Sequence, residues 1–254
     1  MTWKIKKYNH QTFSRNTIKS TIIQLRFQPI LKIADRISDF QEIVRKRFPS
    51  FEEGMVRTIN QMRTDSIEIK EERQFRLGTL DGKTLIGLGP AAIYLESHWH
   101  ESRQELFNDV NIAIDALQKV YSPIVPSRLG MRYINEIDKG KISKDFGRAL
   151  EWKDLIDKEY LKGPISLASL NATLFSHEIR SKVNGGMLTL RYGLVGDIDN
   201  PTFSFDIDRY FEGNFEFGTL DARMHAFADD IFSSYMTIVG DSLKEWLTKS
   251  NGEK

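Results

Sequence analysis

The chain of 254 residues carries 36 Lys and Arg against 35 Asp and Glu, a formal net charge of +1, and 40% of its residues are hydrophobic. This composition excludes a disordered chain, and the charge balance argues against a protein whose whole surface binds a polyanion. The absence of cysteine excludes disulfides, thiolate catalysis and Cys-ligated zinc or iron–sulfur sites. No apolar run reaches the ~18 residues of a membrane span and no signal peptide is recognisable, so we expect a cytoplasmic protein without membrane contact.

The first part of the chain predicts strands and two helices. Ile23, Leu25 and Phe27 alternate with polar residues, which indicates a half-buried strand over 19–27. Apolar residues at helical spacing predict one helix over 33–48 and another over 102–121, which begins with a capping box of Ser102 and Glu105. Four strands are expected between these helices, over 55–62, 67–77, 84–88 and 92–96, with a hairpin turn at Asp81-Gly82.

A similar order follows in the second part. A strand over 128–135 leads into a polar segment of weak helical character over 143–160. Three strands are expected over 168–182, 187–195 and 202–208, separated by turns at 184–186 and 199–201. A long helix over 220–247 closes the chain, with an apolar face that includes Leu220 and Trp246.

The element order β-α-ββββ-α, then β-(α)-βββ-α, predicts an α+β fold of two similar halves. We place the halves at residues 1–125 and 126–254, packed as one compact unit, with antiparallel sheets and long helices on one face. The repeated order resembles the saddle topology of the TATA-binding protein. Such a duplicate would present a concave sheet face to a ligand, although a fold alone does not define a function.

Three segments carry a resemblance to a protein family. They are Ile18–Phe27, Leu85–Leu88 with Trp99 ahead of the Phe107 helix, and Arg128–Asn135. Together they resemble an uncharacterised, sporadically distributed prokaryotic family of about this length, whose central strand reads Gly-x-Arg-Tyr-x-Asn, here Gly130–Asn135. The family implies no established activity. Its patchy distribution is what mobile or defence-associated genes show.

Two acidic or histidine groups are candidates for metal binding. If the strand at 92–96 continued to residue 100, Glu96, His98 and His100 would share one face and would suit Zn²⁺, Mn²⁺ or Fe²⁺. Asp206 and Asp208 share a strand face, near Asp197 and Asp199, and paired carboxylates suit Mg²⁺. The simpler interpretation is a strand-to-helix turn in the first case and ordinary turn composition in the second. We therefore predict no cofactor.

The central strand offers a candidate ligand site. Arg128, Gly130 and Arg132 lie on the face opposite Leu129 and Met131, and two guanidinium groups beside a bare backbone would suit a phosphate or carboxylate. The alternative is that both arginines pair with acids on neighbouring strands and that the glycine makes room for a bulky neighbour.

The N-terminal segment interleaves aromatic and basic residues in a way that would suit single-stranded nucleic acid. This set is Trp3, Lys4, Lys6, Lys7, Tyr8, His10, Phe13, Arg15 and Lys19. The alternative, which we favour, is a leading segment whose aromatic side chains pack on the domain.

The sequence carries no specific catalytic motif, which favours a non-enzymatic binding or regulatory protein with a protein partner or a second copy of itself. A metal-assisted hydrolase or nuclease in a defence or toxin setting is the first alternative. Nucleic-acid binding through a concave sheet is the second.

Overall fold

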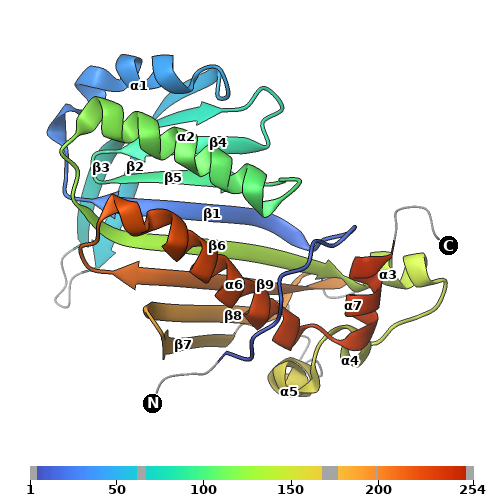
Figure 1. Ribbon diagram of the computed structural model, residues 1–254. Helices are drawn as coiled ribbons and strands as arrows, with labels where there is room; N and C mark the ends of the chain where they lie inside the picture. The colour runs from blue at the N-terminus through green and yellow to red at the C-terminus, as the bar shows by residue number, and fades with distance from the viewer. Residues whose placement is uncertain (1–4, 62–66, 168–176, 198–199, 250–254) are drawn as a thin grey trace. The chain divides into compact units, whose positions relative to one another are not determined.

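A computed structural model of the chain describes residues 5–61, 67–167, 177–197 and 200–249. It is a mixed α+β protein, as predicted (Figure 1). The strands found in the described residues are β1 Ile18–Phe27, β2 Ser50–Gln61, β3 Ile67–Gly78, β4 Thr84–Gly89, β5 Ala92–Ser97, β6 Pro126–Asp138, β7 His177–Val183, β8 Gly186–Gly196 and β9 Pro201–Glu212. The helices are α1 Ile37–Val44, α2 Arg103–Tyr121, α3 Lys139–Phe146, α4 Trp152–Leu155, α5 Lys158–Leu167, α6 Leu220–Ile238 and α7 Asp241–Thr248, with 3₁₀ turns η1 Leu31–Arg36 and η3 Phe217–Thr219.

The hydrogen-bonded order of the strands is β2-β3-β4-β5-β1-β6-β9-β8-β7. The hairpin pairings are antiparallel, as are those of β1 with β5 and of β8 with β9. The chain forms two compact units. Unit 1 comprises residues 1–20, 131–211 and 220–254, and unit 2 comprises residues 21–130 and 212–219. Strand β1 begins in unit 1 and ends in unit 2, and strand β6 begins in unit 2 and ends in unit 1. The boundary predicted at residues 125 and 126 stays a prediction.

Unit 2 has its core between α1, α2 and one face of strands β1, β3, β4 and β5 (Figure 1). The predicted alternation of β1 is confirmed, since Ile23, Leu25 and Phe27 are all buried. The stripe of α2 is also buried, including Leu106 and Leu117. The predicted helix over 33–48 begins as the 3₁₀ turn η1 and is α-helical only over Ile37–Val44. Strand β2 begins five residues before the predicted start, directly after Pro49.

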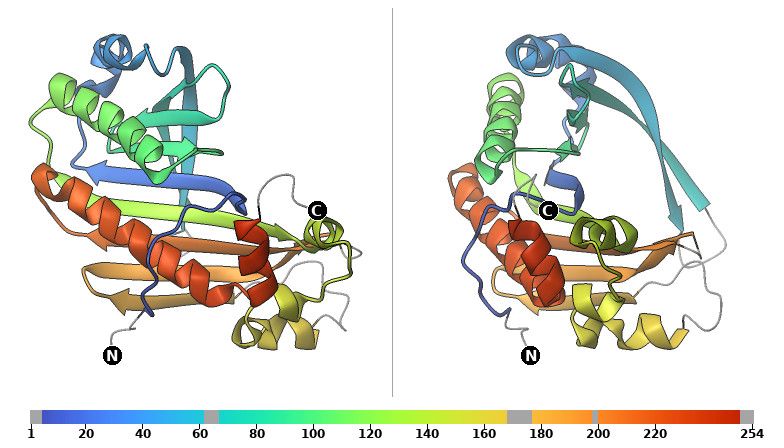
Figure 2. Two further views of the ribbon diagram at one scale, coloured as in Figure 1. Left: turned by 45° about the vertical axis from the view of Figure 1, so that its right-hand side comes forward. Right: turned by 90° about the vertical axis from the view of Figure 1, so that its right-hand side faces the viewer.

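In unit 1, α6 lies along one face of the strands (Figures 1 and 2). Phe203, Phe205 and Ile207 alternate along β9 and are fully buried, and the ring of Phe205 packs edge-on against Tyr235 of α6 at 6.0 Å between centroids. Burial raises the pKa of the Tyr235 hydroxyl, which bonds Thr17 at 2.9 Å. The polar segment predicted as weakly helical forms the short helices α3, α4 and α5. Of the strand predicted over 168–182, residues 168–176 lie outside the described residues.

The prediction of one helix over 220–247 was wrong, because the chain breaks at Gly240 between α6 and α7. The N–H of Gly240 donates to the carbonyl of Leu155 at 2.7 Å. A Cβ at position 240 would lie only 2.8 Å from the carbonyl oxygen of Asp154. The end of α4 therefore approaches the backbone so closely that only glycine fits, and this long-range contact ends α6.

A buried arginine joins the elements of unit 1. The side chain of Arg209 is 2% exposed and donates from Nε to Asp230 of α6 at 2.9 Å. It also donates to the carbonyl oxygens of Met187, Tyr210 and Asn184, at 3.2, 3.1 and 2.5 Å. Arg209 thus connects β9, the β7–β8 hairpin and α6 within the core, where a guanidinium group needs such partners.

None of the helices in the described part of the chain combines the length and the apolar character that crossing a lipid bilayer requires.

Candidate functional site

A row of charged side chains crosses neighbouring strands of unit 1 on the face opposite α6. Asp206 alternates along β9 with Phe205 and Ile207, which pack toward α6, so its carboxylate lies on the other face. Its register partner on β8 is Arg191, and the partner of Arg191 on β7 is Glu178. We call the following set the charge row: Arg132 of β6, Asp206 of β9, Arg191 of β8, and Glu178 and Arg180 of β7.

Asp206 is the centre of the charge row. Arg132 donates from Nε and Nη2 to its two carboxylate oxygens, each at 2.7 Å, and Arg191 donates from Nη1 at 3.0 Å. The Asp206 side chain is only 11% exposed, whereas those of Arg132 and Arg191 are 41% and 37% exposed. The hydrogen bond with Asp206 raises the pKa of Arg132. A bidentate, charge-assisted pair of this kind fixes the guanidinium plane, so Arg132 is held in one orientation while part of it faces solvent.

The outer part of the charge row lies on β7. Arg191 donates from Nε to Glu178 at 2.7 Å, and Arg180 donates to the other Glu178 oxygen at 3.0 Å. Each arginine is therefore oriented by a carboxylate. The exposure of the side chains increases toward the edge, to 44% for Glu178 and 55% for Arg180.

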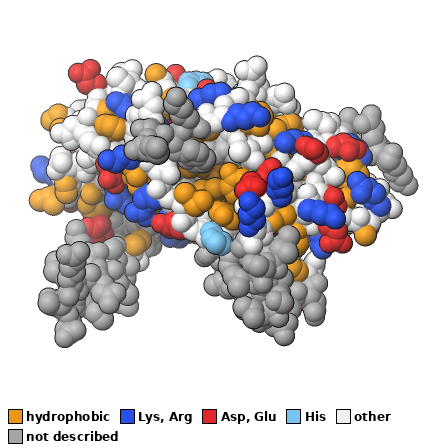
Figure 3. Space-filling view, turned by 90° about the horizontal axis from the view of Figure 1, so that it is seen from below, with side chains coloured by type: hydrophobic (Ala, Val, Ile, Leu, Met, Phe, Trp, Pro, Cys, Tyr) orange, Lys and Arg blue, Asp and Glu red, His pale blue; other side chains and the backbone are white. Residues whose placement is uncertain are grey.

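The charge row and the neighbouring Asp208 together are balanced in charge. The charge row has three arginines and two carboxylates, and Asp208, two residues from Asp206, also attracts Arg132. Three positive and three negative charges give a local sum of zero. Figure 3, which shows the molecule from below, likewise has Lys and Arg beside Asp and Glu with hydrophobic side chains between them. A mixed surface of this kind suits a protein partner better than a polyanion.

The three residues predicted as a ligand site have partners within the protein. Arg132 is paired with Asp206, as described. In unit 2, Arg128 donates from Nη1 to Gln24 at 3.1 Å and lies 3.7 Å from a carboxylate oxygen of Glu212. A Cβ at position 130 would lie 2.5 Å from Nη1 of Arg128, so Gly130 makes room for that guanidinium group. These contacts match the alternative considered for this strand.

Of the acidic set predicted for magnesium, Asp199 lies outside the described residues. Asp197 lies just beyond the end of β8, and Asp206 and Asp208 share a face of β9, as expected. Both carboxylate oxygens of Asp206 accept hydrogen bonds from arginines. A cation there would have to displace two guanidinium groups, which makes this arrangement a poor fit for a metal.

The set of Glu96, His98 and His100 does not share a strand face, because β5 ends at Ser97. His98 Nε2 lies 3.8 Å from a Glu96 oxygen. His100 lies in the turn ahead of α2, where burial lowers the pKa of its imidazole. Among the described residues no group of three His, Asp or Glu side chains is arranged to hold a metal ion.

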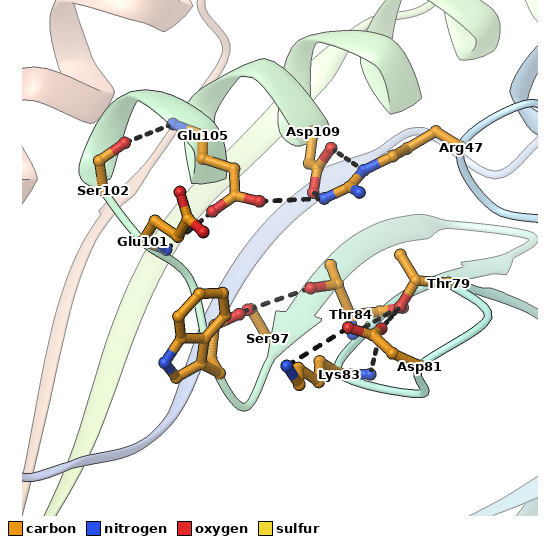
Figure 4. Close-up of polar contacts among 11 residues, drawn as sticks. Arg47, Thr79, Asp81, Lys83, Thr84, Ser97, Glu101, Ser102, Glu105 and Asp109 are labelled. Atoms are coloured by element: carbon orange, nitrogen blue, oxygen red, sulfur yellow. Dashed lines mark hydrogen bonds and ion pairs between the residues drawn. The ribbon is translucent and has the colours of Figure 1, made fainter.

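The turn into α2 is organised by polar contacts (Figure 4). The hydroxyl of Ser102 accepts a bond from the N–H of Glu105 at 3.2 Å, which confirms the Ser102 half of the predicted capping box but not the reciprocal bond to the N–H of Ser102. The Glu105 carboxylate accepts from the N–H of Glu101 at 2.7 Å, one residue before the helix cap. Arg47 donates to both oxygens of Asp109, at 2.8 and 2.9 Å. These contacts give the region a structural role.

The described part of the N-terminal segment packs on α6, as we favoured. Lys7 pairs with Asp230, and the backbone N–H of Tyr8 donates to the Ser233 hydroxyl at 3.2 Å. The rings of His10 and Phe13 lie 5.2 and 6.1 Å from that of Phe232. Trp3 and Lys4 lie outside the described residues. Of the rings that would stack on bases, those of His10 and Phe13 are thus engaged by α6, whereas Lys6 lies over the ring of Tyr8.

Three members of the charge row, Arg191, Glu178 and Arg180, were missed in the sequence, and Glu178 pairs with both arginines. A signal for the pair of Glu178 and Arg191 was present, because a two-residue loop at Asn184-Gly185 places Val183 opposite Gly186. Counting away from the turn along both strands, one residue at a time, brings Glu178 opposite Arg191. No comparable signal exists for Arg132 and Asp206, which are far apart in the chain and are joined by the non-local pairing of β6 with β9.

Comparison with models of known protein families found no match, and a search of curated proteins found no significant similarity. The family resemblance of the Leu129–Asn135 segment therefore stays a prediction. The fold and the charge row define a mixed α+β protein with an ordered, charge-balanced polar sheet face.

Proposed function

We propose that this protein is a non-enzymatic binding protein and that the charge row is its recognition surface for another protein. The observation that carries the proposal is the clamp of Arg132 and Arg191 on the nearly buried carboxylate of Asp206. Arginine side chains that are fixed before binding lose little conformational entropy on association, and arginine is enriched among the residues that dominate binding energy.

The charge balance of this face supports a protein as the partner. A surface that binds nucleic acid carries an excess of basic side chains, because it must neutralise phosphate groups. A surface with alternating charges can instead form complementary ion pairs with a protein partner, which gives specificity. We also propose that the chain is a duplication of a β-α-sheet-α unit, as the element order predicts. In this proposal the charge row lies on the concave face of the resulting saddle. Metal-assisted hydrolysis gains no support from the residues of the charge row, because arginines occupy the carboxylate that would bind the metal.

Photo-crosslinking in the cells that make the protein tests this proposal. A photoreactive residue is placed at Ser204, two residues from Asp206 on the same face of β9, and a control is placed at exposed Ala222 of α6. We expect a discrete protein adduct from position 204 that is absent from position 222. The same adducts from both positions, or none from position 204, would contradict the proposal.

A matched variant links the adduct to the clamp. Arg132→Gln combined with Asp206→Asn removes one charge of each sign and leaves no unpaired buried carboxylate, so we expect the fold to survive. The adduct should be lost in this variant while its melting temperature stays within a few degrees of the wild type. Adducts that consist of nucleic acid would instead favour nucleic-acid binding through a concave sheet. Stoichiometric Zn or Mn found by elemental analysis would favour a metal-assisted hydrolase or nuclease.

A further inference from the structure

The outer edge of β7 has the features of a pairing surface. β7 is the last strand in the hydrogen-bonded order, so within the described residues no strand borders its outer edge. Glu178, Ile179, Arg180 and Lys182 are all exposed, and Ile179 is 44% exposed. An edge strand with an exposed β-branched residue is a template on which another strand can pair.

The hairpin defines which backbone groups of β7 point outward. Val183 and Gly186 face each other across a loop of only two residues, so they must form a hydrogen-bonded pair. Because hydrogen-bonded and non-hydrogen-bonded pairs alternate, Ile179 directs its N–H and C=O toward β8. Glu178, Arg180 and Lys182 direct theirs toward the outer edge, where an added strand would meet them.

A second copy of β7 is complementary to this edge. In an antiparallel pair with a two-fold axis at Ile179, Glu178 of each copy faces Arg180 of the other. The two Ile179 residues face each other as a non-hydrogen-bonded pair, the type in which side chains lie closest. Opposite charges that face each other across strands stabilise a sheet, and two such pairs form here. Symmetric registers centred on Glu178 or on Arg180 would instead place two like charges opposite each other.

We propose that two copies of this protein associate through antiparallel pairing of their β7 edges about a two-fold axis at Ile179. The surface includes Glu178 and Arg180, the outer members of the charge row, but uses neither Arg132 nor Asp206, so the inference does not depend on the proposed function. A contact along one strand of seven residues falls below the ~1,200 Å² typical of stable interfaces. The dimer should therefore be in concentration-dependent equilibrium with the monomer.

Disulfide trapping tests the register, because the chain contains no cysteine of its own. In a non-hydrogen-bonded antiparallel pair the Cα atoms lie about 4.5 Å apart, which suits a disulfide. We expect the full-length Ile179→Cys variant to form a disulfide-linked dimer under mild oxidation at least several-fold faster than Lys182→Cys. Equal, slow crosslinking of the two variants would overturn the proposal.

Charge reversals test the Ile179-centred register. Arg180→Glu places Glu178 opposite a glutamate in the proposed register and should slow crosslinking of the Ile179→Cys protein. Lys182→Glu makes the same charge change on the same strand and should not. The opposite result would overturn the Ile179-centred register.

Sedimentation of the cysteine-free wild type keeps the test independent of the cysteine substitutions. We expect its mean mass to rise with concentration and that of Arg180→Glu to stay lower. A wild type that remains monomeric throughout the concentration series would also overturn the proposal.

Discussion

Replacement of Arg209 by methionine tests whether the buried ion pair organises unit 1. Methionine keeps most of the apolar length of the side chain but leaves Asp230 in the core with Lys7 as its remaining cationic partner. It also leaves three backbone carbonyl oxygens without the guanidinium donor. Removing one member of a buried pair costs about 3–5 kcal/mol. Because Lys7 is 67% exposed and strongly solvated, we expect little of this loss to be recovered by Lys7.

The assay is the free energy of unfolding from urea titration followed by circular dichroism. Arg209→Met should lower it by about 3–5 kcal/mol, whereas Lys7→Met, which breaks only the exposed pair, should cost less than about 1 kcal/mol. The double variant Arg209→Met with Asp230→Leu removes both charges and should recover a large part of the loss. A cost below about 1 kcal/mol for Arg209→Met, or additive losses in the double variant, would refute the reasoning.

Three further predictions concern local conformation and pH. Gly186→Ala should destabilise the protein by at least about 2 kcal/mol more than Gly82→Ala in urea titration. Gly186 has φ +144° and its added Cβ would collide with the carbonyl oxygen of Tyr210, whereas Gly82 has φ +69° and open space around it. Ser102→Ala should lower the melting temperature through the loss of a helix cap of about 1 kcal/mol, and Ser102→Gly should cost only a few tenths. Burial lowers the pKa of His100 below its ordinary value of 6.5. As the pH falls, the imidazole therefore takes up its proton in the unfolded state before it does so in the folded state. The free energy of unfolding should decrease between pH 6.5 and the lower pKa of the folded state. His100→Gln should therefore flatten the pH dependence of the unfolding free energy in that window, and an unchanged slope would contradict this assignment.

Local sequence patterns predicted most elements, because the signals that define them are local. The alternation of Ile23, Leu25 and Phe27 and the cap at Ser102 depend on neighbours within a few residues. The break at Gly240 was missed because its cause is the end of α4, far away in the chain. Gly240 was a local signal for a helix end, since glycine often follows the last helical residue, but a single glycine does not define a break. The contact with the end of α4 does define it.

The candidate site was predicted in part. The sequence identified Arg132 and Asp206 separately, as an anion ligand and as a metal ligand, and the structure shows them bound to each other. Their chemical types were visible in the sequence, but their roles depend on the register between β6 and β9. A carboxylate has the same sequence signature whether it binds a cation or orients an arginine, and only the geometry distinguishes the two.

The division of β1 and β6 between the two units has a consequence for synthesis on the ribosome. Unit 2 is nearly complete once residue 130 has emerged, lacking only residues 212–219. Residues 1–20, although they are made before unit 2, belong to unit 1 and find their partners on β6 and α6 more than a hundred residues later. This segment must therefore wait while later segments fold, and Thr17 reaches its final contacts only after Tyr235 has been added.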